Sequence, residues 1–101
     1  MSKITYIDAK DIYPLFYKII DTLNLNYIDL GRVKIFYSRG TTTKAYARIY
    51  GFPRILQKAL DIKPIYVIEL VSENFNKLND EQKIKVLIHE ILHIPKTFSG
   101  A

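Results

Sequence analysis

The amino-acid sequence predicts an α+β fold with one small mixed or antiparallel sheet. Three observations carry this prediction. Apolar residues recur at helical spacing near the N-terminus and again in the last quarter of the chain. In segments between these two regions, more apolar and more polar residues alternate with a period of two. The chain has 101 residues, 49% of them hydrophobic and 25% charged, and no internal repeat or linker divides it. Residues 1–101 therefore read as a single domain.

The first predicted element is a helix within residues 8–25. Its apolar residues at helical spacing are Ile12, Leu15, Phe16, Ile19, Ile20 and Leu23. Asp8 is a residue type that can cap a helix, but Pro14 is tolerated only in the first turn or two. The proline therefore favours a later start, near Asp11.

Extended segments follow. In residues 32–38 more apolar and more polar side chains alternate, which predicts a strand, and residues 45–51 predict a second strand. Residues 38–44 (SRGTTTK) have the composition of a turn, so the two strands together predict a hairpin. Residues 52–62 predict a short helix opening at Pro53. Residues 63–71 (KPIYVIELV) are the most strand-like segment, because nearly all of them are apolar, β-branched or aromatic.

The last predicted element is a helix from Asp80 to about His93. Asn79 and Gln82 have the spacing of a capping box, and Pro95 ends the helix. At about 100° per residue, one stripe holds the core-facing apolar residues. His89 and His93 lie within about 40° of each other on nearly the opposite side, with Glu90 beside them. The core-facing residues are Ile84, Leu87, Ile88 and Ile91.

The His89-Glu90-x-x-His93 pattern is typical of a zinc hydrolase. Two imidazoles one turn apart can bind one Zn²⁺, and a carboxylate between them can act as general base toward a water on that metal. The alternative is a pair of helix histidines that only pack, next to a solvated glutamate. The chain has no cysteine, so thiolate metal sites and disulfides are excluded.

Residues 66–100, YVIELVSENFNKLNDEQKIKVLIHEILHIPKTFSG, resemble the small zincin-type metallopeptidases of archaea and phages, and more distantly the SprT-type minimal zincins. The resemblance implies a minimal zincin-like fold with His89 and His93 as zinc ligands and Glu90 as general base and acid. It also implies that residues 65–71 form a sheet edge that pairs with an extended peptide, unless they are an internal core strand.

The third metal ligand is where the sequence departs from related patterns. Lys96 and Ser99 stand where a metzincin has glycine and histidine. The resemblance places a further histidine just beyond Ala101, so we expect a chain truncated at its C-terminus, which would bind zinc weakly. Other sources of the ligand are a neighbouring chain or an upstream carboxylate, namely Glu69, Glu73 or Asp80.

The function expected from these residues is a zinc-dependent hydrolase, a metallopeptidase acting on peptide or protein substrates. The alternative is an inactive zincin-like domain that binds nucleic acid or protein through its basic surface, since the net charge is +5. No segment has the length of a membrane span or the apolar core of a signal peptide. We therefore expect a cytoplasmic protein without a membrane partner. The resemblance implies an archaeal or phage source, which includes a virus or provirus, and the oligomeric state is left open.

Overall fold

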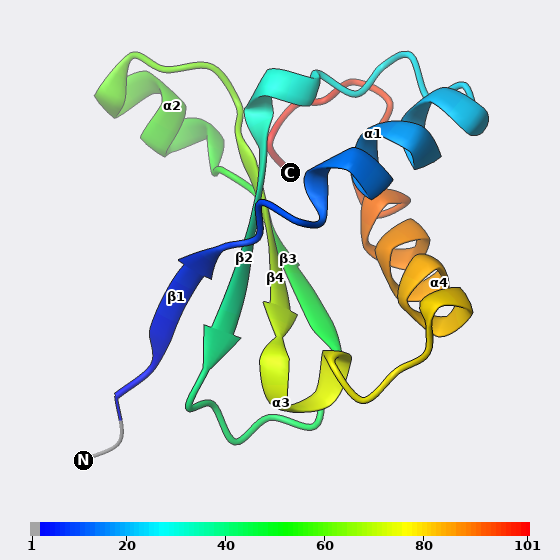
Figure 1. Cartoon of the computed structure of the whole chain (residues 1–101). Coiled ribbons are helices and arrows are strands. Elements are labelled where there is room, and N and C mark those ends of the chain that lie inside the picture. Colours follow the sequence, from blue (N-terminus) through cyan, green and yellow to red (C-terminus); the bar gives the residue numbers. More distant parts are fainter. Residues whose placement is uncertain (1–2) are drawn as a thin grey trace.

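The computed structural model describes residues 3–101 and confirms the α+β class (Figure 1). Its four-stranded sheet has the order β1-β2-β4-β3. Strand β2 is parallel to β4, whereas β1 pairs with β2 and β3 with β4 in antiparallel fashion, so the sheet is mixed. The strands are β1 (Thr5–Asp8), β2 (Val33–Arg39), β3 (Ala47–Tyr50) and β4 (Tyr66–Val71), and the helices are α1 (Tyr13–Thr22), α2 (Arg54–Leu60), α3 (Ser72–Phe75) and α4 (Asp80–Ile91), with a 3₁₀ turn at Leu30–Arg32.

One face of the sheet is covered by α1 and α4, and the core lies between them and the strands (Figure 1). Alternate side chains of β4 point into this core, as the period of a strand requires. Each fully buried aliphatic or aromatic side chain there contributes about 1.5–3 kcal/mol of transfer free energy. The core includes Phe16, Ile19, Ile35, Tyr66, Ile68, Leu70, Leu87 and Ile91.

The predicted hairpin between residues 32–38 and 45–51 is wrong, because β4 lies between β2 and β3. The segment between those strands crosses the end of β4 instead of making a tight turn. Asn74 Nδ2 donates to the carbonyls of Thr43 and Ala45, at 2.9 and 2.8 Å, and Glu73 accepts from the Gly40 amide at 2.7 Å. The most apolar strand therefore occupies the middle of the sheet, where both its edges are paired.

The position of β4 also corrects the expectation that residues 65–71 form the sheet edge. Tyr66–Val71 is an internal strand, and the edges of the sheet are β1 and β3. Strand β1 was not predicted from the sequence. Asp8 is its last residue and not a helix cap, and α1 begins at Tyr13 with Pro14 in its first turn. The later start that Pro14 favours is confirmed.

The capping box of α4 is confirmed in both directions. Asn79 Oδ1 accepts from the Gln82 amide at 2.8 Å, and Gln82 Oε1 accepts from the Asn79 amide at 3.0 Å. The helix ends at Ile91, two residues earlier than predicted. Pro53 precedes α2 as expected. No helix among residues 3–101 is long and apolar enough to cross a bilayer.

Candidate metal centre

Helix α4 presents His89 and His93 side by side, on the side of the helix opposite its core residues Leu87 and Ile91. Their Nε2 atoms are 3.3 Å apart and their rings meet edge to face, with centroids 4.8 Å apart. Both histidines are exposed, whereas Leu87 and Ile91 on the core side of the helix are fully buried. The sequence prediction of two faces is therefore confirmed.

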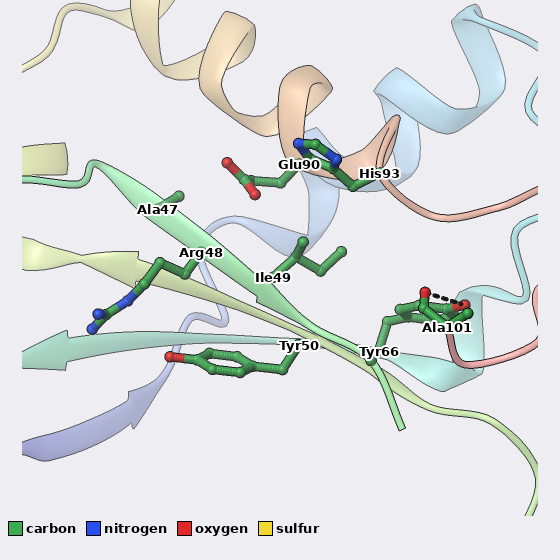
Figure 2. Close-up of a pocket in the computed structure, with 9 residues that line it drawn as sticks. Ala47, Arg48, Ile49, Tyr50, Tyr66, Glu90, His93 and Ala101 are labelled. Atoms are coloured by element: carbon green, nitrogen blue, oxygen red, sulfur yellow. Dashed lines mark hydrogen bonds between the residues drawn. The ribbon is translucent and has the colours of Figure 1, made fainter. Parts of the chain in front are cut away.

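Glu90 lies between α4 and the edge strand β3, and Figure 2 shows its carboxylate extending toward β3. Only 8% of the residue is exposed. Burial raises the pKa of Glu90, and the proximity of His89 and His93 lowers it by less. A carboxylate with a raised pKa accepts a proton more readily than an ordinary surface glutamate does.

Two hollows flank Glu90 along β3. One, of about 580 Å³, is lined by Ile49, Tyr50, Tyr66, His93 and Ala101, together with Ala47 and Glu90. The other, of about 400 Å³, lies on the His89 side and shares Ala47 and Glu90 with the first. Because both hollows include these two residues, we describe them together as the β3–α4 groove. The groove lies beside β3, which is an edge strand of the sheet.

The pair of histidines fits two ligand positions of a single zinc ion. Two nitrogens bound to one tetrahedral zinc at 2.0–2.1 Å are about 3.3–3.4 Å apart, and the two Nε2 atoms are 3.3 Å apart. The same distance would suit a hydrogen bond between two neutral imidazoles. Metal analysis separates these two interpretations.

A third ligand is not brought to this pair. Among residues 3–101, no cluster of three or more His, Asp or Glu side chains is placed to hold a metal ion. Of the upstream alternatives, Glu69 is bound by Arg48 and Tyr50, and Glu73 by the Gly40 amide. Asp80 is at the first turn of α4, roughly 13 Å along the axis from His89.

The segment that follows α4 turns back toward the groove. The Gly100 amide donates to the Tyr66 hydroxyl at 2.7 Å, and the Gly100 carbonyl accepts from the Phe52 amide at 2.8 Å. Backbones approach so closely here that a Cβ on Gly51 would lie 2.2 Å from the Gly100 carbonyl oxygen. As a result Ala101 lines the same hollow as Glu90 and His93.

An ionic cluster around the buried Glu69, which the sequence did not predict, fixes β3 to β4. Arg48 and Glu69 are direct partners in the sheet register. The guanidinium donates to the carboxylate at 3.2 and 2.9 Å, and the Tyr50 hydroxyl donates to it at 2.7 Å. Burial alone would raise the pKa of Glu69, but the hydrogen bonds from Arg48 and Tyr50 help to lower it. The available signal was a lone glutamate in the otherwise apolar segment 65–71.

Comparison with known proteins identifies a family. The family described as "Putative phage metallopeptidase" matches residues 4–101, which is nearly the whole chain. No curated protein and no solved structure matches the sequence.

Proposed function

The chain belongs to the phage metallopeptidase family, and from this premise we propose that it is a zinc-dependent peptidase with its reaction centre on the exposed side of α4. The observation that carries the proposal is the pair of Nε2 atoms 3.3 Å apart next to the buried Glu90 carboxylate. The alternative, an inactive domain that binds nucleic acid or protein, is not favoured, because the family is one of metallopeptidases.

In this proposal His89 and His93 would hold the metal ion through their Nε2 atoms, and Glu90 would move the protons of the reaction. Bound zinc would act as a Lewis acid, polarising the scissile carbonyl and lowering the pKa of water at the site to about 7. Glu90 accepts the proton of the attacking water and returns it to the departing amine. The result is amide hydrolysis without a covalent enzyme intermediate.

The unpaired edge of β3 is the proposed binding strand for the peptide. It takes the role that the sequence analysis gave to residues 65–71, which lie inside the sheet. An extended peptide could add to β3 by main-chain hydrogen bonds and would then run past Glu90 through the β3–α4 groove. The Arg48–Glu69 pair supports this role because it fixes β3 against β4.

Two histidines are fewer than the three protein ligands of a typical catalytic zinc site. We propose that the third comes from residues that follow Ala101 in a longer chain. Ala101 lines the same hollow as Glu90 and His93, so the next residues would start inside that hollow. A ligand from a second copy of the chain is the competing source.

The test is hydrolysis of a quenched fluorescent peptide library by the zinc-loaded protein. We expect Glu90→Gln to lower the rate by at least about 100-fold, the usual contribution of a general base. Zinc content and thermal stability should not fall. Glu81→Gln is the matched control, because Glu81 is exposed on the same helix and pairs with the exposed Lys85. A Glu90→Gln protein that keeps its activity would remove Glu90 from the mechanism.

A further inference from the structure

Helix α2 exposes its apolar side to solvent. None of its residues is buried. Ile55 is 77% exposed and Leu60 59% exposed, and Leu56 and Ile62 are also exposed. A surface helix of a globular protein ordinarily turns such residues toward the core. We call these four residues the α2 apolar surface.

Hydrogen bonds fix this orientation. Gln57 is the only residue of α2 that is half-buried, and its Nε2 donates to the carbonyls of Phe52 and Ser99, at 2.8 Å each. At about 100° per residue, Ile55 and Ala59 lie on the side of the helix opposite Gln57. The polar side of α2 therefore faces the protein, and its apolar side faces outward.

The charges beside the α2 apolar surface are nearly all positive. Arg54 and Lys58 lie on one flank of the helix, Lys63 follows it, and Asp61 is the one acidic residue in residues 52–63. The whole chain carries a net charge of +5. Two copies of this surface would repel each other, whereas an anionic surface would attract it.

Helix α2 also projects from the end of the sheet where β3 ends and β4 begins, away from α1 and α4 (Figure 1). A projecting helix is convex, which suits a flat and fluid surface without the need for a matching groove. Aliphatic side chains on one side of a helix and Lys or Arg beside them are the features of helices that lie in a bilayer interface. Lys and Arg can reach lipid phosphates while their methylene stems stay among apolar groups.

We propose that α2 binds the surface of a lipid bilayer with anionic headgroups, with the α2 apolar surface inserted at the boundary between headgroups and acyl chains. This goes beyond peptide hydrolysis and does not depend on it. It also departs from the sequence expectation of no membrane partner. That expectation was based on the absence of a spanning segment and of a signal peptide. An exposed two-turn helix that lies on a bilayer is a different feature.

The experiment is sedimentation of the 101-residue chain with large unilamellar vesicles in low salt. One set of vesicles contains phosphatidylglycerol and phosphatidylcholine in equal parts, and the other contains phosphatidylcholine alone. The test protein is the double variant Ile55→Ser/Leu60→Ser. Its matched control is Ile7→Ser/Leu23→Ser, which removes two apolar side chains that are 56% and 44% exposed on other elements. Circular dichroism verifies that both variants are folded.

We expect the unaltered chain and the control to bind the phosphatidylglycerol vesicles alike. The test variant should bind on the order of tenfold or more weakly, because two inserted side chains are lost. Binding should also weaken in high salt and on phosphatidylcholine alone. Failure of the unaltered chain to bind would overturn the proposal, and so would equal binding by the test variant. Sedimentation velocity measures whether the chain forms a dimer. If the unaltered chain and the control are dimers and the test variant is not, the α2 apolar surface binds a second copy of the chain instead.

Discussion

Replacement of Arg48 by methionine tests how the edge strand β3 is held. Glu69, only 2% exposed, accepts two hydrogen bonds from Arg48 and one from Tyr50. Arg48→Met keeps most of the aliphatic stem but leaves the carboxylate buried with Tyr50 as its remaining donor. Breaking one side of a buried ion pair costs about 3–5 kcal/mol. Because 38% of the Arg48 side chain is exposed, solvent screens the pair, and we expect about 2 kcal/mol.

For a domain of this size, that loss lowers the thermal midpoint by on the order of 10 °C. The pH dependence gives a second, independent readout. The pKa of Glu69 is lowered in the folded protein, so its contribution to stability is present above the ordinary glutamate pKa and disappears as pH falls through the lowered value. The two proteins should therefore differ most near pH 7 and converge toward pH 3.

Thermal unfolding followed by circular dichroism, at intervals from pH 3 to pH 7, measures both effects. The double variant Arg48→Met/Glu69→Gln removes the buried charge as well, and it should regain part of the stability lost in Arg48→Met. An equal loss at pH 3 and pH 7, with no recovery in the double variant, would refute the reasoning. It would assign the effect to side-chain packing.

Two further predictions concern the site and the segment beside it. His89→Ala and His93→Ala should each weaken zinc binding, which competition with a chelating dye measures. Loss of a group that only orients a metal ligand weakens binding by roughly 10- to 100-fold, and loss of a ligand itself should cost more. Since both side chains are exposed, the thermal midpoint without zinc should change little, and an unchanged zinc affinity would place the metal elsewhere. Gly51→Ala should cost about 1–3 kcal/mol, because its Cβ would displace the Gly100 carbonyl and break the hydrogen bond to Phe52. Urea denaturation measures this loss, and an unchanged midpoint would mean that the terminal segment moves aside freely.

The elements predicted correctly are those whose signals are local. The capping box at Asn79 and Gln82, the proline before α2 and the apolar run of β4 each depend on residues within a few positions of one another. Strand order depends on pairings between distant segments. The parallel pairing of β2 with β4 joins residues 33 positions apart, such as Val33 with Tyr66, and leaves β3 outside. Adjacent extended segments therefore suggested a hairpin that does not form.

The same division applies to the candidate site. Helical spacing predicted that His89 and His93 share the side of α4 away from the core, and it placed Glu90 beside them. Which strand faces Glu90 could not be predicted, because that follows from the strand order. The resemblance implied that residues 65–71 form the sheet edge, but their apolar character agrees with the alternative, an internal strand in the middle of the sheet. The edge strand β3 is only half-buried and gave a weaker signal.

The most direct test of the proposed metal centre is the zinc content of the protein, purified without a histidine tag and measured by elemental analysis after zinc addition and removal of the excess. The 101-residue chain is compared with a version that carries the further residues we propose after Ala101, each with and without His89→Ala. We predict about one zinc per extended chain, less in the 101-residue chain, and none in either His89→Ala protein. An absence of zinc from both unaltered proteins would contradict the metal centre and leave two histidines that only pack.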